Sequence, residues 1–226
     1  MTTIPTGWYT TGEPISGYGV QTTSVHHDSK AKFLDAALRV IRAKGYTATT
    51  IEDVCEVAGL TKGSFFHHFD SKEELAIAAA DHFAAMADEL FATAPYQRAA
   101  DPLDRLLGYV DFRIDILQGA LPEFTCLLGT MVQEVYQTHP AIRAACDEHL
   151  SAHATALARD IAQAKARHAP RARWSAESLA VFTQAAIQGA FVLAKARQGP
   201  EVAAECLRHL RRYLQTQFNR TPAKGA

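Results

Sequence analysis

The chain has 226 residues, and its 23 Lys and Arg against 24 Asp and Glu give a formal net charge of -1. Hydrophobic residues make up 48% and charged residues 21%, which is the balance of a soluble globular protein. These values exclude a wholly disordered or fibrous chain, and the length allows one large domain or two small ones. The near-neutral charge also means that any binding of nucleic acid must come from a few placed cations rather than from a basic surface.

Residues 1–28 are rich in Thr, Gly and Pro and contain neither Lys nor Arg. They lack the positive and apolar regions of a secretory signal, and we expect them to form a flexible arm. No stretch of the chain reaches the roughly 18 apolar residues that a membrane span needs. The cysteines are far apart in the sequence, which is typical of reduced thiols in a cytoplasm, so we expect a cytoplasmic protein. They are Cys55, Cys126, Cys146 and Cys206.

The spacing of apolar residues predicts helices from Lys30 almost to the C-terminus. The first helix ends at Gly45, and Thr50-x-x-Asp53 is a capping-box pattern at the start of the second. A similar pattern at Ser71 begins a long helix. No segment alternates with period two over a useful length, so we expect an all-α fold of about nine helices. Gly and Pro breakers separate the later helices, at about 103–118, 123–138, 141–167, 175–197 and 201–218.

Residues 50–69 predict a capped helix, a tight Gly-Leu turn and a second helix of about two turns. An isolated helix this short is marginal in water, so neighbouring helices must support it through Leu60, Phe65 and Phe69. The opposite face then carries side chains that can hydrogen-bond to a base edge or a phosphate, with Gly63 permitting close approach. This layout is that of a helix-turn-helix, and an ordinary core helix pair is the alternative. The polar side chains are those of Thr61, Lys62, Ser64, His67 and His68.

The same segment resembles the signature of a known family. Residues 60–75, with the sequence LTKGSFFHHFDSKEEL, are similar to the G-[ST]-[LF]-Y-x-[HY]-F-x-[SN]-K pattern of TetR-type (TetR/AcrR) transcriptional regulators. The similarity extends upstream through GYTATTIEDVCEVAG and covers about residues 30–76. The resemblance implies an N-terminal three-helix helix-turn-helix domain over residues 29–76. It also implies a larger helical ligand-binding and dimerisation domain over residues 77–220.

The resemblance further implies contacts of single residues with a double-stranded DNA operator. Lys62 becomes the candidate for a contact with guanine O6 and N7, and His67 faces the groove. Phe66 departs from the family pattern, which most often has Tyr there, and the missing hydroxyl removes one phosphate contact worth about 1 kcal/mol. The remaining implied contacts, with bases, the adjacent backbone or phosphates, are those of Thr49, Thr50, Thr61, Gly63, Ser64 and Lys72.

The predicted DNA-binding segment is nearly neutral, with 7 basic and 8 acidic residues between Asp28 and Leu75, so non-specific affinity should be modest. One short recognition helix cannot supply high affinity, so a homodimer must read a pseudo-palindromic operator. Apolar stripes on the last two predicted helices would form a four-helix interface with the partner. The alternative is that both stripes pack only within one chain. The stripes consist of Leu179, Phe182, Ala186, Gly189, Ala190 and Leu193, followed by Leu207, Leu210, Leu214 and Phe218.

The helices between about residues 75 and 167 are expected to enclose an effector. Their candidate pocket residues are apolar and aromatic with few fixed charges, which suits a small and mostly uncharged ligand. Aromatic residues at helical spacing also form plain cores, so packing alone is the alternative for each of them. The candidate set is Phe83, Phe91, Phe112, Ile116, Phe124, Cys126, Met131 and Tyr136.

Two groups of thiol and imidazole side chains leave a sensing function open. Cys126 is in a segment similar to a Gly-Cys-Leu motif in a subgroup of TetR-type repressors, some of which respond to electrophilic or unsaturated molecules, although Thr125 replaces the usual Gly. A helix start stabilises a thiolate, whereas a buried cysteine is inert. Cys146, His149 and His153 share one side of a helix, at a spacing that suits zinc ligands. The alternative is a core cysteine with two boundary histidines.

The sequence contains no nucleophile elbow, Walker loop, Rossmann fingerprint or H-E-x-x-H motif. We therefore expect no enzymatic activity, no cofactor and no bound metal. Together with the resemblance, the sequence predicts a ligand-responsive repressor that a small effector releases from its operator. The alternative is a metal- or thiol-redox-sensing regulator of the same fold that uses Cys126 or the group of Cys146, His149 and His153.

Overall fold

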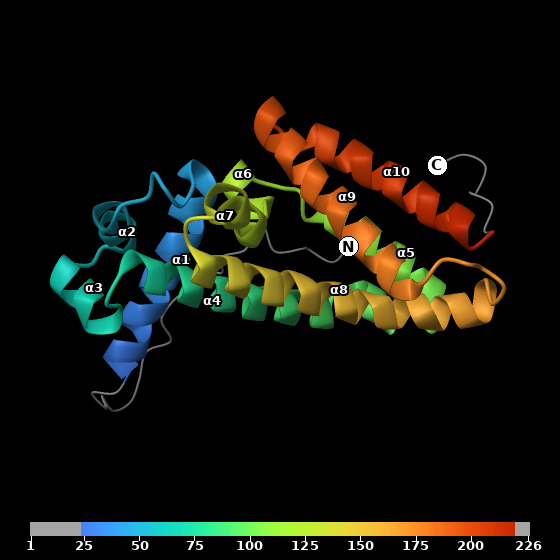
Figure 1. Ribbon diagram of the computed structural model, residues 1–226, viewed down its shortest axis with the longest axis horizontal. Coiled ribbons are helices and arrows are strands. Elements are labelled where there is room, and N and C mark those ends of the chain that lie inside the picture. Colours follow the sequence, from blue (N-terminus) through green and yellow to red (C-terminus); the bar gives the residue numbers. More distant parts are fainter. Residues whose placement is uncertain (1–23, 220–226) are drawn as a thin grey trace, which may run out of the picture. The chain divides into compact units, whose positions relative to one another are not determined.

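Helices make up the described part of the chain (Figure 1). The computed structural model describes residues 24–219, with side chains from Ser29 onward. Within this range there are ten α-helices, one 3-10 helix and no strand, which confirms the all-α prediction. Of the arm predicted over residues 1–28, the part up to residue 23 lies outside the described residues. The backbone of residues 24–28 belongs to the first helix, α1 (Ser24–Lys44), which therefore begins before the predicted start at Lys30.

Contacts divide the chain into two compact units. The first unit contains the described residues up to Ala85 together with Pro122–His149, and the second contains Met86–Leu121 and the described residues from Leu150 onward. The division crosses two long helices, α4 (Lys72–Thr93) and α8 (Pro140–His168). The first unit therefore joins the helix-turn-helix region to a segment from the middle of the chain. Its other helices are α2 (Ile51–Ala58), α3 (Lys62–His68), α6 (Leu121–Phe124) and α7 (Leu127–Val135).

Local hydrogen bonds fix the ends of α2 and α3. The Thr50 hydroxyl accepts a hydrogen bond from the Asp53 amide at 3.2 Å, and the Asp53 carboxylate accepts one from the Thr50 amide at 2.7 Å. The predicted capping box is therefore confirmed. Gly59 ends α2 with a left-handed φ of 66°, which glycine adopts at low cost because it lacks a Cβ. Thr61 then caps α3 by accepting a hydrogen bond from the Ser64 amide at 3.2 Å.

The single helix predicted over residues 123–138 is wrong, because α6 and α7 are separated by a break at Thr125 and Cys126. Cys126 has an extended backbone, and its sulfur accepts a hydrogen bond from the Gly129 amide at 3.4 Å, so it caps a new helix. The buried guanidinium of Arg42 donates from Nη1 to the Thr125 carbonyl oxygen at 3.3 Å. The backbone at the break thus gains hydrogen bonds that a continuous helix would otherwise supply.

The second unit is organised around α10, which packs against α9 and α5. Helix α9 is long and apolar enough to cross a membrane by length and composition alone, with a mean hydropathy of 1.4, and no other described helix meets this test. The expectation concerned an unbroken apolar run, and α9 does not have one, because Thr183, Gln184 and Gln188 interrupt its apolar residues. One side of α9 packs against α10 within the second unit. Apart from α4 and α8, the helices of this unit are the 3-10 helix η1 (Pro95–Arg98), α5 (Pro102–Asp115), α9 (Ala176–Arg197) and α10 (Glu201–Gln217).

Candidate nucleic-acid interface and ligand site

Helix α3 is held from one side by aromatic packing. Phe65 is fully buried and Phe69 nearly so, and both rings lie edge-on to Phe33 of α1, with centroid distances of 5.6 and 6.3 Å. The predicted supporting role of Phe65 and Phe69 is confirmed. His68 belongs to the same side, because its Nε2 lies 2.6 Å from the Ser29 hydroxyl of α1. The prediction that His68 shares the exposed face is therefore wrong.

The other side of α3 is accessible. Among the residues of α3 and its N-cap that were predicted to contact DNA, Ser64 is half-buried and the others are exposed. The exposed fraction of Phe66 is 53%. A Cβ added at Gly63 would meet no heavy atom closer than 3.7 Å, so another molecule can approach the backbone there. A helix face of this kind can reach base edges in a major groove. The predicted contacts that the structure brings together here are Thr61, Lys62, Gly63, Ser64, Phe66 and His67.

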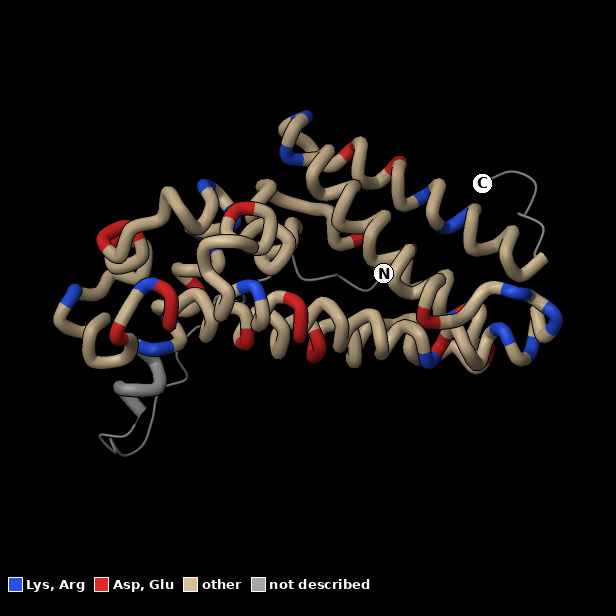
Figure 2. The backbone as a smooth tube through the Cα atoms, in the orientation of Figure 1, with Lys and Arg blue, Asp and Glu red and all other residues tan. Residues whose placement is uncertain are grey.

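Lys62 is paired with an acidic neighbour. Its Nζ contacts the carboxylate of Glu52 on α2, and both side chains are more than half exposed. The hydrogen bond from Lys62 lowers the pKa of Glu52, which keeps this carboxylate ionised. Figure 2 shows that basic and acidic residues are interspersed along the helices of the first unit. The predicted contact of Lys62 with a guanine would therefore require Lys62 to leave Glu52.

Two predicted phosphate contacts instead stabilise the loop between α1 and α2. Thr49 is 1% exposed, and its hydroxyl donates to the Gly45 carbonyl oxygen at 2.6 Å. Lys72 donates from Nζ to the carbonyl oxygens of Tyr46 and Thr49, at 3.1 and 2.8 Å, and burial lowers the pKa of Lys72. Burial contradicts the predicted phosphate contact of the Thr49 hydroxyl. Lys72 is half-buried, and its predicted phosphate contact stays a prediction. Thr50 remains exposed at the N-terminus of α2.

Helix α7 holds the same loop from another direction. The Glu134 carboxylate accepts a hydrogen bond from the Thr47 amide at 3.0 Å, and it occupies the space that a side chain at Gly45 would need. Gly45 has a left-handed φ of 87°, which also favours glycine. The Tyr46 ring packs edge-on against His139, with a centroid distance of 5.1 Å. Sequence reasoning missed these contacts because the loop and the segment from α6 to α8 are far apart in the chain.

The eight predicted effector-pocket residues are divided between the two units, with five in the first and three in the second. Tyr136 is 54% exposed, which contradicts its place in an enclosed pocket. Cys126 is half-buried at the N-terminus of α7. The others are buried or half-buried, namely Phe83, Phe124 and Met131 in the first unit, and Phe91, Phe112 and Ile116 in the second.

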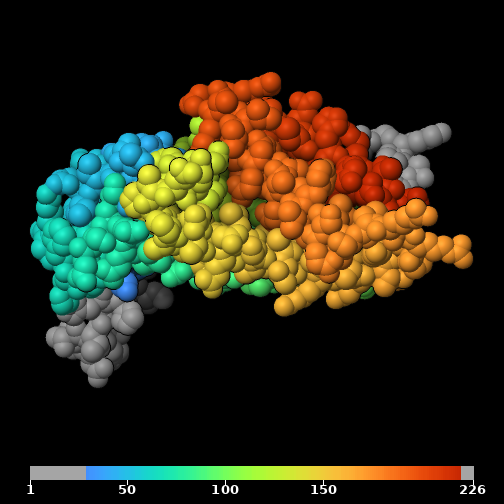
Figure 3. All heavy atoms as spheres, in the orientation of Figure 1, coloured from blue at the N-terminus to red at the C-terminus, as the bar shows by residue number. Residues whose placement is uncertain are grey.

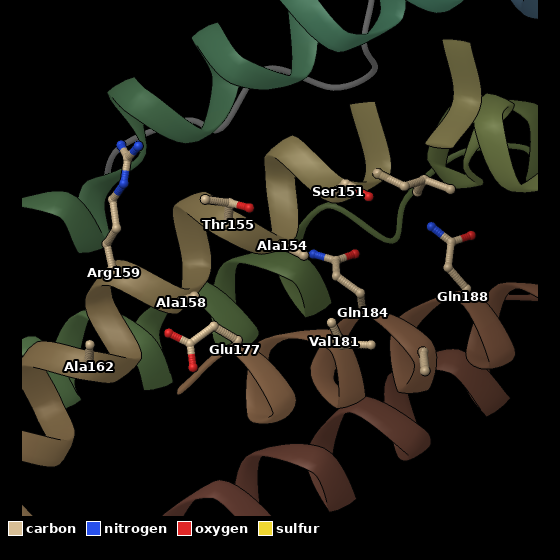
Figure 4. A pocket seen from close by; sticks show the side chains of 12 residues that line it. Ser151, Ala154, Thr155, Ala158, Arg159, Ala162, Glu177, Val181, Gln184 and Gln188 are labelled. Carbon is tan, nitrogen blue, oxygen red and sulfur yellow. The ribbon is translucent and has the colours of Figure 1, made fainter. Parts of the chain in front are cut away.

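An open groove of about 590 Å³ lies between α8 and α9 in the second unit (Figure 4). Small side chains from the two helices, such as Ala154 and Val181, form much of its lining, so the helices leave space between them. Gln184 of α9 extends into the groove, and none of the predicted pocket residues lines it. The groove is therefore a ligand-sized space that aromatic patterning in the sequence did not indicate.

A polar cluster joins α5, α8 and α9 in the second unit. The Tyr109 hydroxyl accepts hydrogen bonds from Nε and Nη2 of Arg113, at 3.1 and 3.0 Å, and from Nε2 of Gln184 at 3.2 Å. Nε2 of His153 lies 2.9 Å from the same hydroxyl. Burial, together with the charge of Arg113, lowers the pKa of His153 to about 3 and keeps the imidazole neutral. Sequence reasoning missed this cluster, although Tyr109 and Arg113 have the i, i+4 spacing of a helix pair.

The three residues of the zinc-binding alternative have separate surroundings. Cys146 is fully buried, and burial raises the pKa of its thiol to about 12. His149 Nε2 lies 2.7 Å from Asp81 Oδ1, whereas His153 contacts Tyr109. No group of three His, Cys, Asp or Glu side chains in the described part of the chain is arranged to hold a metal ion. The geometry therefore favours a core cysteine with two histidines that have other partners.

Helix α9 has one apolar side in the core and another at the surface. On the surface side, Phe182 and Leu193 are 47% and 43% exposed, and Gly189 has open space at its Cβ position. Val181 and Val192, which are not part of the predicted stripe, are also exposed. Figure 3 shows atoms of α9, in orange, at the surface of the second unit. Ala186 is half-buried, and packing within the chain accounts for the remaining predicted interface residues, which are Leu179, Ala190, Leu207, Leu210 and Leu214.

Known proteins resemble this chain over both predicted domains. The family described as "Bacterial regulatory proteins, tetR family" matches residues 33–79, and the family described as "Tetracyclin repressor-like, C-terminal domain" matches residues 102–210. The two matches together cover more than half of the chain.

Among curated relatives, the HTH-type transcriptional regulator TtgR of Pseudomonas putida is 33% identical over 76 residues, which are 34% of this chain and 36% of TtgR. The HTH-type transcriptional repressor KstR2 of Rhodococcus jostii is 40% identical over 53 residues, which are 24% of this chain and 26% of KstR2. In these matches the chain spans less than two thirds of the relative's own length.

Solved structures share the fold over most of the chain. The regulatory protein TetR from Rhodobacter sphaeroides superposes with a TM-score of 0.74 at 24% identity, covering 84% of this chain and 99% of that one. At this identity the comparison shows the fold alone, and the matches of the two families supply the relationship. The chain therefore belongs to the TetR family and is a TetR-type helix-turn-helix regulator.

Proposed function

We propose that the protein is a cytoplasmic transcriptional repressor that binds a pseudo-palindromic operator as a homodimer and is released by a small effector. The observation that carries this proposal is the exposed polar face of α3, whose opposite side is fixed by Phe65 and Phe69. A helix held in this way can enter a major groove in a defined orientation. The names of TtgR and KstR2, a transcriptional regulator and a transcriptional repressor, support the regulatory role.

The proposed dimer interface is the surface side of α9. Phe182 and Leu193 offer apolar area to a partner, and the open position at Gly189 permits close approach of another helix. Tyr213 of α10 extends this surface, because its ring lies 4.9 Å from that of Phe182. A symmetric dimer supplies two copies of α3, which is what a pseudo-palindromic operator requires.

Fluorescence anisotropy with a labelled duplex from the region upstream of the protein's own gene tests operator binding. We expect this duplex to bind at least about 10³-fold more tightly than a scrambled duplex of the same composition. Lys62→Ala removes a candidate base contact and should weaken operator binding by roughly 5- to 150-fold. Arg171→Ala is the matched control, because it removes one exposed positive charge from the loop between α8 and α9.

The outcomes separate sequence recognition from general attraction to DNA. Equal affinity for the upstream and scrambled duplexes would refute operator recognition at this site. Equal losses in Lys62→Ala and Arg171→Ala would show that Lys62 contributes charge and no base contact. A reporter driven by the bound promoter tests the repressor role, since removal of the protein should raise its expression.

A thiol response at Cys126 is the second candidate function, because this residue is the N-cap of α7. The Gly129 amide donates a hydrogen bond to its sulfur at 3.4 Å, and the residue is half-buried rather than enclosed in the core. Treatment with iodoacetamide should then abolish DNA binding in the wild type and leave it intact in Cys126→Ser. Cys206→Ser is the matched control, since Cys206 is also half-buried. If Cys126→Ser is inactivated as fast as the wild type, Cys126 is not the sensor.

A further inference from the structure

Arg113 is a half-buried cation whose partners are all uncharged. Its guanidinium donates hydrogen bonds to the Tyr109 hydroxyl and lies 3.2 Å from Nε2 of His153. It also lies over the rings of Phe91 and Tyr109, with distances of 4.3 and 5.3 Å to their centroids. Within the described residues, no carboxylate lies within ion-pair distance of Arg113.

Another arginine of α5 has the partner that Arg113 lacks. Arg105, about two turns earlier, forms an ion pair with Asp160 at 3.0 Å and a hydrogen bond to Gln163. Removing a charge from water is costly unless an opposite charge accompanies it, and contacts with aromatic rings offset only part of this cost. Of these two arginines, Arg113 would therefore gain more electrostatic stabilisation from a bound anion.

The charge of the cluster is fixed at a single unit. Protonation of His153 would place a second cation against Arg113, and its pKa of about 3 prevents this at physiological pH. Burial raises the pKa of Tyr96, so that phenol also stays neutral. A single positive charge matches a monoanion such as a carboxylate better than a doubly charged phosphate.

One edge of the guanidinium is accessible. Nε and Nη2 of Arg113 hydrogen-bond within the cluster, whereas Nη1 makes no hydrogen bond with the described residues. Every buried side-chain nitrogen or oxygen among the described residues has a hydrogen-bond partner. Nη1 is therefore not fully enclosed by the described residues, and a hydrogen bond from it to a ligand oxygen would leave the bonds to Tyr109 in place.

Aromatic side chains surround this charge. The Phe91 ring lies 5.9 Å from that of Phe112, and the Tyr96 ring lies 5.9 Å from those of both Tyr109 and Phe112. Phe91 is buried, whereas Tyr96 and Phe112 are half-buried, so these two rings offer part of their apolar surface to a ligand beside Arg113. The site thus combines a single cation with an aromatic wall.

We infer that Arg113 binds the carboxylate of a small organic acid whose apolar or aromatic body packs against Phe91, Tyr96 and Phe112. This inference rests on the proposed function for its regulatory meaning, because it names the chemical class of the effector. It replaces the mostly uncharged ligand expected from the sequence. Gln184 links the cluster to the groove between α8 and α9, since it hydrogen-bonds to Tyr109 and also lines that groove.

Titration calorimetry with benzoate and benzamide tests the inference in the full-length protein without DNA. The two probes share a ring and differ in charge, so we expect benzoate to bind at least about tenfold more tightly. Arg113→Gln should abolish this preference, and Arg113→Lys should retain part of it because the charge remains. Arg105→Gln is the matched control and should keep the preference, since Arg105 is already paired.

The preference for benzoate separates a binding role from a structural role, because a damaged fold weakens both probes alike. Equal binding of the two probes by the wild type, or no binding of benzoate, overturns the inference. A preference that survives Arg113→Gln overturns it as well. Adding benzoate to the protein–operator complex is a separate test. If benzoate binds through Arg113 and the operator is retained, the site stands and the proposed effector-driven release fails.

Discussion

Mild acid should destabilise the protein through His153. The pKa of this imidazole is lowered from its ordinary value of 6.5 to about 3 in the folded chain, because burial and the Arg113 charge oppose protonation. Between these two values the unfolded chain binds a proton at His153 that the folded chain does not. The free energy of unfolding must therefore fall as the pH falls below about 6.5, and it must recover as the pH rises.

The size of this effect follows from the pKa difference. Each pH unit between the two pKa values changes the stability by about 1.4 kcal/mol per group. At pH 5, about 1.5 units below the ordinary value, His153 should lower the free energy of unfolding by about 2 kcal/mol relative to neutral pH. A change of this size is a large part of the stability of an ordinary domain.

Urea unfolding of the wild type and His153→Gln at pH 7 and pH 5 measures the effect. Protein concentration must be the same throughout, because the proposed dimerisation would contribute to apparent stability. The remaining histidines are common to both proteins, so the difference between their pH responses isolates His153. We expect the wild type to lose about 2 kcal/mol more than the variant between the two pH values. Equal losses would refute the neutral, buried state of His153.

Three further changes test the packing and the interface. Gly45→Ala forces a left-handed φ on alanine and pushes its methyl group against Glu134, so we expect a loss of at least about 1 kcal/mol in urea unfolding. A Glu134→Ala background should recover part of that loss, and no recovery would mean that Glu134 moves aside freely. Thr50→Ala removes the cap of α2 and should cost about 1 kcal/mol, whereas an equal loss in Thr50→Ser would contradict the cap. Phe182→Glu should shift the proposed dimer towards monomer in sedimentation velocity, and Arg171→Glu is the control. An unchanged mass of Phe182→Glu would exclude the surface side of α9 as the dimer interface.

The sequence sufficed for the local structure of the helix-turn-helix. Thr50 and Asp53 are three residues apart, and Gly59 follows the helix that they start, so both ends of α2 could be predicted from neighbouring positions. The support of α3 by Phe65 and Phe69 could also be predicted, because a short helix must bury its apolar side. These features depend on interactions that are local or that follow helical periodicity.

Contacts between distant segments could not be predicted in the same way. Thr49 and Lys72 carry the side-chain types of phosphate ligands, and only the folded loop shows that their polar groups bind nearby carbonyl oxygens. The break before α7 depends on Arg42, which precedes it by more than 80 residues. Periodicity in that region favoured one continuous helix because its apolar spacing continues across the break.

The ligand site illustrates a different limit. Aromatic residues were selected one by one, so Phe91 and Phe112 were found while the charged residue over the Phe91 ring was not. In the sequence, Arg113 has the spacing of an ordinary surface arginine on a helix. The pattern of polar residues in α5 therefore did not indicate that its side chain is half-buried. Its importance depends on the partners that His153 and Gln184 bring from two other helices.

The composition of the first unit determines what could be transplanted between regulators. A chimaera joined between residues 76 and 77 would take Arg42 away from Thr125 and Thr47 away from Glu134. In the chimaera, the loop between α1 and α2 would then pack against the α7 of another regulator and would lose its hydrogen bond to Glu134. An exchangeable module must therefore consist of two stretches of chain, the N-terminal helices and residues 122–149, moved together. Modularity in this protein is a property of the folded unit rather than of a contiguous length of gene.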